Sequence, residues 1–344
     1  MENSKMQAAL LVKKGNADKA FEIREVPVPQ VSDYYILIKV EALGLNYADI
    51  MARQGQYKDA PPMPAILGYD VCGTVVAVGK KVTLHQLGDR VAALTRFGGY
   101  AQYAATEERA AVKIDTNMDI CAALAMTTQA ATAWYCSHEA CSIYKNDKVL
   151  ITAAAGGVGS LLVQLAALQG AKVYGIVSSK EKEKLVVSLG AQAAFNRSEG
   201  DVFAQFQAVA GKKALDVMLD SAGGSYVKKG IKNLAPGGRM VSYGGSQGSH
   251  AKNIFQLIPF ALSFGFYHPV QFLMQSQSLI GVNILRIADN KPDLLRQCLL
   301  QPMELYRQGK LKPLPGKAYP IGKLAEAQQA LEDGAVPGKI AVSW

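Results

Sequence analysis

A glycine-rich turn between an expected strand and an expected helix limits the fold of this chain more than any other feature. The turn follows an apolar strand expected at residues 149–152 and opens a helix expected at residues 161–168. Small residues let the backbone approach a pyrophosphate, and the free N–H groups of a helix N-terminus attract its charge. A tight turn with a purely structural role is the alternative. The residues predicted to contact a dinucleotide are Ala155, Gly156, Gly157 and Val158.

Strands and helices alternate after about residue 148, whereas the first third of the chain is rich in strand patterns. Apolar strands are expected at residues 173–177, 217–219 and 240–243, each followed by a polar or glycine-containing turn. This alternation predicts an α/β domain with one doubly wound parallel sheet, the Rossmann arrangement. Near the N-terminus, Ile36, Ile38 and Val40 alternate with other residues as in a half-buried strand. The sequence therefore predicts a β-rich domain followed by a Rossmann domain.

Composition favours a folded protein that binds small anions over a nucleic-acid-binding protein. Of the 344 residues, 49% are hydrophobic and 19% are charged, which suits large packed cores. The net charge of +9 comes from scattered basic pairs without interleaved aromatics, so no dedicated nucleic-acid partner is expected. The five cysteines form no C-x-x-C pair, and the first ten residues lack a continuous apolar stretch. Both observations favour a reduced, cytoplasmic compartment.

The residues at the end of the second Rossmann strand indicate which dinucleotide binds. Domains that prefer NAD carry Asp or Glu about 20 residues after the glycines, to bind the adenosine ribose. Here that position reads Val177-Ser178-Ser179-Lys180, without an acid. A ribose phosphate would meet Ser178 and nearby lysines without repulsion, so NADPH is the expected cofactor. The alternative is that these lysines are a solvated helix face.

Five segments of the chain, in sequence order, are Gly44-Leu-Asn46-Tyr47-Ala-Asp49, Gly68-Tyr69-Asp70-x-x-Gly73, Gly98-Gly99-Tyr100, Ala153-x-x-Gly156-x-x-Gly159 and Asp220-Ser221-Ala-Gly223-Gly224. In this order and spacing they resemble the medium-chain dehydrogenase/reductase superfamily. The resemblance spans residues 6–344 and is nearest to quinone reductases, including the vesicle amine transport protein branch. It implies a GroES-like catalytic domain at residues 1–125 and 275–344, a Rossmann domain at 126–274, and a substrate cleft between them.

The resemblance also implies roles for particular residues. Lys182 and Arg197 match positions that contact the 2′-phosphate, with Arg197 replacing a common tyrosine. Asn46 would lie near the nicotinamide and Tyr57 near the cleft mouth, where each could donate a hydrogen bond to the acceptor oxygen. Packing is the alternative role for Tyr57, which can combine burial with one hydrogen bond. Further expected cofactor contacts are Thr132, Ser221, Tyr243 and Gly244, with turn or strand packing as their alternative role, together with Asn283.

The chain departs from the zinc alcohol dehydrogenases of this superfamily. In those enzymes a cysteine and a histidine bind the catalytic zinc. This chain has Asn46 and Tyr69 at the two positions, and Asp70 replaces the usual glutamate. The four-cysteine lobe is missing and the four histidines lack ligand spacing, so no metal site is expected. Without a Lewis acid, the expected substrates are quinones or α,β-unsaturated carbonyls, which delocalise the charge of an added hydride. The alternatives are a cofactor-binding regulatory or vesicle-associated protein with weak catalysis, and an accessory enoyl reductase.

Residues 253–285 contain no Asp, Glu, Lys or Arg. The stretch exceeds the length of a bilayer span, but Pro259 and Pro269 interrupt it, so no transmembrane segment is expected. An exposed apolar patch marks an interface, a ligand pocket or a membrane-contacting surface. A homodimer interface or pocket wall is the expectation, and contact with a membrane surface is the alternative.

Overall fold

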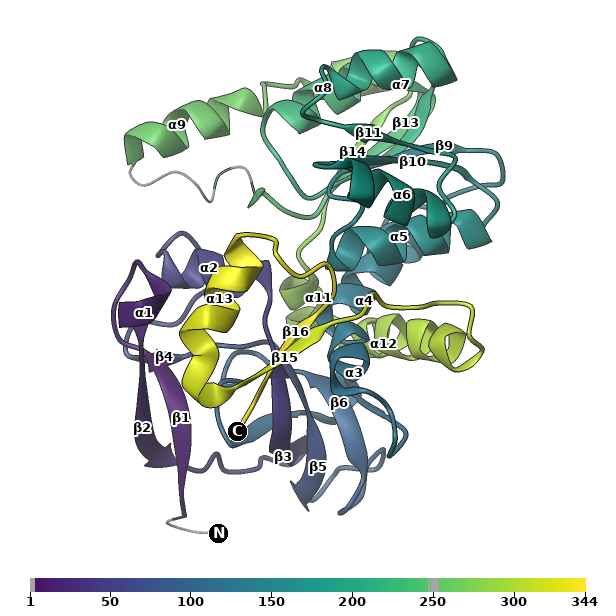
Figure 1. Ribbon diagram of the computed structural model, residues 1–344. Coiled ribbons are helices and arrows are strands. Elements are labelled where there is room, and N and C mark those ends of the chain that lie inside the picture. The colour runs from purple at the N-terminus through teal and green to yellow at the C-terminus, as the bar shows by residue number, and fades with distance from the viewer. Residues whose placement is uncertain (1–3, 247, 249–253) are drawn as a thin grey trace. The chain divides into compact units, whose positions relative to one another are not determined.

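The computed structural model describes residues 4–246, 248 and 254–344, with the side chains of residues 254–257 left undescribed. The chain divides into two compact units (Figure 1). The first unit comprises Met1–Ala131 and Ile284–Trp344, and the second comprises Thr132–Asn283. The first unit is thus built from both ends of the chain.

The second unit contains a six-stranded sheet in which every pair of neighbours is parallel, in the order β11-β10-β9-β12-β13-β14. Its central strand consists of Val149, Leu150 and Ile151 after Lys148, and all three apolar residues are fully buried. Continuous apolar strands are typical of a parallel sheet that is covered on both faces. The strands are β9 (Lys148–Ile151), β10 (Lys172–Val177), β11 (Ala193–Asn196), β12 (Leu215–Asp220), β13 (Leu234–Ser242) and β14 (Ser278–Gly281).

Helices cover both faces of this sheet. Figure 1 shows α5 (Gly157–Leu168) and α6 (Lys180–Ser188) on one face, and α7 (Val202–Ala210) and α8 (Ser225–Asn233) on the other. The doubly wound Rossmann fold predicted from the sequence is therefore confirmed. The unit also contains α9 (Ile254–Ser263), α10 (Pro269–Gln275) and a π-helix at Tyr135–Glu139. This π-helix continues α4 (Thr128–Trp134), which begins in the first unit and ends in the second.

The first unit is rich in antiparallel strands, as expected for a GroES-like domain. Its larger sheet runs β15-β16-β3-β5-β6-β8, with β7 also paired to β3, and a smaller sheet runs β2-β1-β4. The strands are β1 (Lys5–Leu11), β2 (Phe21–Pro27), β3 (Tyr35–Gly44), β4 (Ala65–Ile66), β5 (Asp70–Val78), β6 (Arg90–Leu94), β7 (Tyr103–Glu107), β8 (Ala111–Lys113), β15 (Lys317–Pro320) and β16 (Ile340–Ser343).

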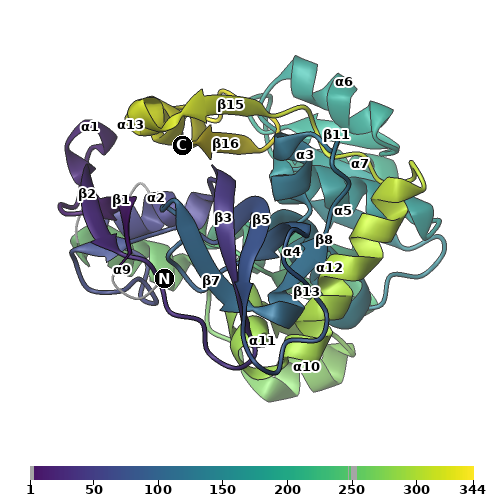
Figure 2. The same ribbon diagram turned by 90° about the horizontal axis from the view of Figure 1, so that it is seen from below.

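The C-terminal strand β16 joins this sheet beside β3, near the opposite end of the sequence (Figure 2). Ile36 and Ile38 of β3, Val71 of β5 and Val342 of β16 are buried together in one core. The helices of this unit are α1 (Ala17–Ala20), α2 (Tyr47–Arg53), α3 (Ile120–Ala125), α11 (Ile284–Asn290), α12 (Pro292–Arg307) and α13 (Leu324–Glu332). No helix within the described part of the chain is long and apolar enough to span a membrane.

Candidate functional site

The glycine-rich turn lies between β9 and α5, at the carboxyl edge of the parallel sheet. Gly156 is the N-cap of α5, which begins at Gly157. A Cβ atom on Gly159 would lie 2.2 Å from the carbonyl oxygen of Ala153, so only glycine allows this close approach of helix and turn. Ala155 is buried, whereas Gly156, Gly157 and Val158 are partly exposed. The turn thus offers the first N–H groups of a 12-residue helix to an anion.

The residues predicted to contact a 2′-phosphate follow two neighbouring strands. Val177 and Asn196, the last residues of β10 and β11, are in register, so Ser178 and Arg197 follow adjacent strand ends. The Arg197 backbone N–H donates to the carbonyl oxygen of Val177 at 3.0 Å. From the first turn of α6, Lys182 Nζ donates to Ser178 Oγ at 3.4 Å. Ser178 and Lys182 are in contact, and the backbone of Arg197 is anchored beside them.

Ser221, Tyr243 and Gly244 follow the next two strands, β12 and β13. The Tyr243 backbone N–H donates to the carbonyl oxygen of Asp220 at 2.9 Å. A Cβ atom on Gly244 would lie 2.7 Å from the carbonyl oxygen of Ser221. Thr152 Oγ1 accepts from the Ser221 N–H at 2.9 Å. Three of the expected cofactor contacts are therefore packed together by the backbone.

The carboxylate of Asp220 organises this turn, a role that sequence analysis did not assign. It accepts hydrogen bonds from Thr152 Oγ1 at 2.9 Å and from the backbone N–H groups of Gly223 at 2.8 Å and Ala222 at 3.1 Å. Burial raises the pKa of Asp220, and these hydrogen bonds oppose the rise. The carboxylate is therefore a structural acceptor that holds the turn after β12.

The remaining cofactor candidates of the second unit are its first and last residues in the sequence, Thr132 and Asn283. Thr132, on α4, is buried, and Asn283 is exposed just after β14. Asn283 shares the carboxyl edge of the sheet with the other strand-end candidates. Asn46 and Tyr57 lie in the first unit.

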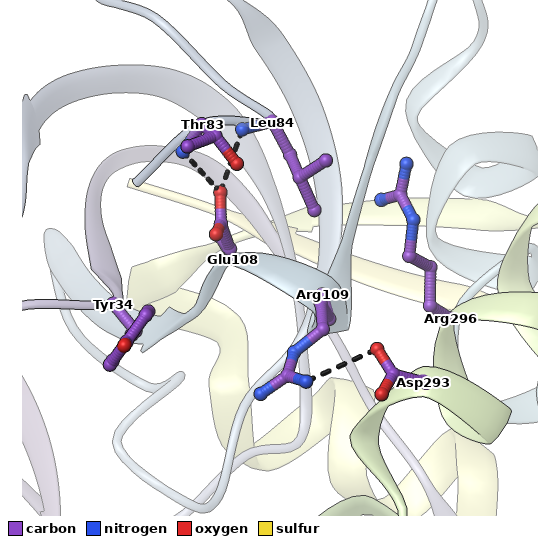
Figure 3. A pocket seen from close by; sticks show the side chains of 7 residues that line it. All are labelled: Tyr34, Thr83, Leu84, Glu108, Arg109, Asp293 and Arg296. Carbon is purple, nitrogen blue, oxygen red and sulfur yellow. Dashed lines mark hydrogen bonds and ion pairs between the residues drawn. The ribbon is translucent and has the colours of Figure 1, made fainter. Parts of the chain in front are cut away.

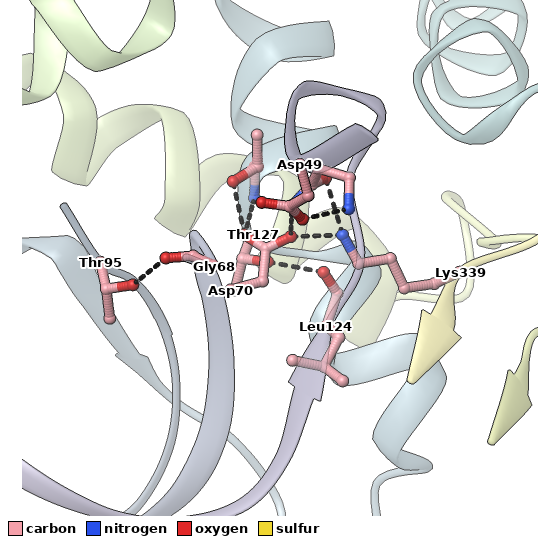
Figure 4. Close-up of polar contacts among 9 residues, drawn as sticks. Asp49, Gly68, Asp70, Thr95, Leu124, Thr127 and Lys339 are labelled. Carbon is pink, nitrogen blue, oxygen red and sulfur yellow. Dashed lines mark hydrogen bonds and ion pairs between the residues drawn. The ribbon is translucent and has the colours of Figure 1, made fainter. Parts of the chain in front are cut away.

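Asn46 belongs to a buried polar cluster of the first unit. Lys339 Nζ donates to Asn46 Oδ1 at 2.9 Å. It also forms an ion pair with Asp70 Oδ2 (Figure 4). Asn46 Nδ2 donates to the same oxygen of Asp70 at 2.7 Å. The relative exposure of Lys339 is 1%, that of Asp70 is 0% and that of Asn46 is 9%. We call these three residues the Lys339 cluster.

Two further groups border the Lys339 cluster. Asp70 Oδ1 accepts from the backbone N–H of Thr128 at 3.0 Å and from its hydroxyl. The Asn46 N–H, at the start of α2, donates to Asp49 Oδ2 at 2.8 Å. Burial raises the pKa of Asp49 to about 7, opposed by that backbone hydrogen bond and by the charge of Lys339. A second carboxyl group, whose pKa burial raises to about 7, therefore borders the cluster.

Lys339 was missed by the sequence analysis. The one available signal is a lysine directly before the apolar run Ile340-Ala341-Val342 that forms most of β16. The aliphatic part of the Lys339 side chain packs against Gly44. A Cβ atom on Gly44 would lie 2.5 Å from Lys339 Cε. The sequence motif that contains Gly44 and Asn46 therefore also makes room for this lysine.

Tyr57 lies next to Tyr69, whose position carries a ligand in zinc-dependent relatives. The ring centroids are 6.3 Å apart in an edge-to-face arrangement. Tyr57 is half-buried and packs against the main core of the unit, while Tyr69 is 2% exposed. Burial raises the pKa of both phenols, so both remain neutral donors at physiological pH. Packing and a hydrogen bond to a ligand are compatible roles for Tyr57.

A surface cavity of about 590 Å³ in the first unit contains none of the predicted site residues. Its lining residues are Tyr34, Thr83, Leu84, Glu108, Arg109, Asp293 and Arg296 (Figure 3). Both acids are engaged: Glu108 accepts from the backbone N–H groups of Thr83 and Leu84, and Asp293 pairs with Arg109 at 3.1 Å. The cavity shares no lining residue with the Lys339 cluster.

The donor atoms around Asn46 do not suit zinc. The Asp70 carboxylate is already paired with an ammonium, the Asp49 carboxyl already accepts the Asn46 backbone N–H, and the other nearby groups are an amide and a phenol. Zinc sites instead use thiolate, imidazole or free carboxylate ligands. Among residues 4–246, 248 and 254–344, no group of three or more His, Cys, Asp or Glu side chains is placed to hold a metal ion.

Comparison with known proteins agrees with this architecture. Residues 32–116 match the alcohol dehydrogenase GroES-like domain family, and residues 157–289 match the zinc-binding dehydrogenase family. Human quinone oxidoreductase is 29% identical over 333 residues, which cover 96% of this chain and 95% of that protein. The zebrafish (Danio rerio) synaptic vesicle membrane protein VAT-1 homolog is 28% identical over 97% of this chain and 69% of that protein.

Among solved structures, the Escherichia coli quinone oxidoreductase in complex with NADPH is similar in fold. Its TM-score is 0.85 at 24% identity, covering 98% of this chain and 100% of that one. The first family match lies within the first unit, and the second lies in the second unit except for its last six residues, 284–289. The chain belongs to the medium-chain dehydrogenase/reductase superfamily.

Proposed function

We propose that this oxidoreductase uses NADPH to reduce quinones or α,β-unsaturated carbonyls without zinc. The observation that carries the proposal is the Lys339 cluster. At the positions where zinc-dependent relatives hold metal ligands, this chain has an amide whose oxygen and nitrogen are both hydrogen-bonded and a phenol that burial keeps neutral. Acceptors that delocalise negative charge need no Lewis acid, so this donor set favours conjugated carbonyl substrates.

The carboxyl edge of the parallel sheet fits NADPH. The N–H groups at the start of α5 would hold the pyrophosphate, and Ser178, Lys182 and Arg197 would hold the 2′-phosphate. The lack of a Cβ atom at Gly159 and Gly244 permits the tight turns that line this edge. The Escherichia coli quinone oxidoreductase of similar fold was solved with NADPH, which supports the choice of cofactor.

When bound, NADPH supplies the hydride, and the protein orients the acceptor. Asn46 retains one amide N–H beyond the one given to Asp70, and Tyr57 keeps a neutral phenol. We propose that these two groups donate hydrogen bonds to the acceptor oxygen as negative charge develops on it. Removing one such donor typically slows catalysis by about a hundredfold or more.

The test is a panel of quinones, enones and simple alcohols, followed by NADPH absorbance before and after dialysis against a chelator. Steady turnover with quinones or enones in metal-free protein is expected, and Asn46→Ala and Tyr57→Phe should lower kcat. Activity that disappears with the chelator and returns with zinc contradicts the proposal. Turnover confined to acyl thioesters would instead assign an enoyl reductase.

We also propose that the uncharged stretch near the end of the second unit forms a homodimer interface. Its first residue, Asn253, lies outside the described residues. Farther along, the exposed fractions are 84% for Phe266, 76% for Leu273 and 73% for Met274. These residues precede β14, the edge strand of the sheet, and an unpaired edge beside an apolar surface favours association with a second copy.

A further inference from the structure

We propose that Lys339 is a positioning residue for the reaction, because it holds the carboxamide of Asn46 in a single orientation. This inference rests on the proposed function, in which Asn46 donates to the acceptor oxygen. Lys339 lies 293 residues from Asn46 in the sequence, and the two side chains meet in the interior of the first unit.

The orientation follows from the chemistry of the two partners of the amide. An ammonium can only donate hydrogen bonds, so the side facing Lys339 must be Oδ1. An ionised carboxylate can only accept, so the side facing Asp70 must be Nδ2. Turning the amide by 180° would set N–H against N–H and oxygen against oxygen. The pair therefore leaves Asn46 one N–H in a defined direction.

The backbone holds the three residues of the cluster in place. Gly44, two residues before Asn46, is in register with Asp70 on one side and with Ala341 on the other. The Leu45 N–H donates to the carbonyl oxygen of Ile340 at 2.9 Å, next to Lys339. Charge-assisted hydrogen bonds away from water are stronger than neutral ones. The amide is thus fixed by strand pairing as well as by charge.

A purely structural ion pair is the competing explanation, and buried pairs are weak evidence for stability. Removing one partner strands a buried charge, so Lys339→Met alone can fail to fold. The informative variant is therefore the double change Lys339→Met with Asp70→Asn, which removes both charges at nearly constant volume. Lys339→Arg serves as the conservative variant.

The experiment measures kcat with a quinone, Kd for NADPH and the thermal midpoint. We expect the double variant to fold and to bind NADPH within about twofold of wild type. Its kcat should fall by about tenfold to a hundredfold, because both charged partners that fix the Asn46 amide are replaced by neutral groups. Lys339→Arg should recover part of this loss. In an Asn46→Ala background the same double change should alter kcat by less than about twofold, since residues acting through one another are not additive.

The matched control is Glu332→Gln, which removes a charged partner of the buried Arg53 elsewhere in the same unit. Wild-type kcat is expected for it. If the double variant folds and keeps wild-type kcat while Asn46→Ala has a lowered kcat, Lys339 has no positioning role. The proposed function is not affected by that result. Wild-type kcat in Asn46→Ala overturns the catalytic role of the amide itself.

Discussion

Replacing Lys182 with alanine should weaken NADPH binding and leave NADH binding almost unchanged. Lys182 Nζ lies 3.4 Å from Ser178 Oγ, where β10 ends and α6 begins. The adenosine ribose of a bound dinucleotide is expected at this place. A hydrogen bond to a charged group contributes about 1.5 to 3 kcal/mol. Lys182 is only partly buried, so solvent screening favours the lower end of that range, or about tenfold in Kd.

Arg197 should behave in the same way, since its backbone is anchored to β10 and its planar guanidinium suits a phosphate. If the two contacts are independent, the affinity of the double variant Lys182→Ala with Arg197→Ala for NADPH should fall by about a hundredfold. The assay is titration of each protein with NADPH and NADH, followed by nucleotide fluorescence at two salt concentrations. The NADPH preference should shrink with added salt because exposed charges are screened.

The control is Lys184→Ala. Lys184 is exposed on the same helix, but it lies two residues after Lys182, and side chains two residues apart point to different faces of a helix. It should bind both cofactors like wild type. Equal weakening of NADH and NADPH in Lys182→Ala, or no weakening of either, would refute the 2′-phosphate assignment. The basic residues would then be a solvated helix face.

Two further predictions concern stability and assembly. Because burial raises the folded-state pKa of Asp49 from 3.8 to about 7, its stabilising contribution is complete below about pH 4 and is lost as the pH rises to about 7. Asp49→Asn should therefore gain stability relative to wild type across that interval in urea unfolding, and parallel pH profiles would contradict this. Leu273→Asp should convert a dimer to a monomer in sedimentation velocity, whereas Leu87→Asp, 62% exposed in the first unit, should not. If the wild-type protein sediments as a monomer, the proposed dimer interface is wrong.

Local patterns in the sequence were sufficient to predict the Rossmann unit and the residues at the carboxyl edge of its sheet. The turn from Ala153 to Gly159 combines a strand end, a close backbone approach and a helix start within seven residues. The carboxyl ends of parallel strands share one edge, so Ser178, Arg197 and Ser221 could be placed together once the alternation of strands and helices was recognised. The antiparallel unit was predictable as a class, from alternating residues and the superfamily resemblance.

The sequence alone could not show what surrounds Asn46. Its partners, Asp70 and Lys339, are brought to it by the pairing of β3 with β5 and of β3 with β16. No periodicity or spacing encodes that pairing, because the Asn46–Lys339 contact spans 293 residues. The sequence therefore determined which groups are present at the candidate site. Only the tertiary structure decided that a buried ammonium and a carboxylate hold the amide, because the two strand pairings that bring them together form only in the folded unit.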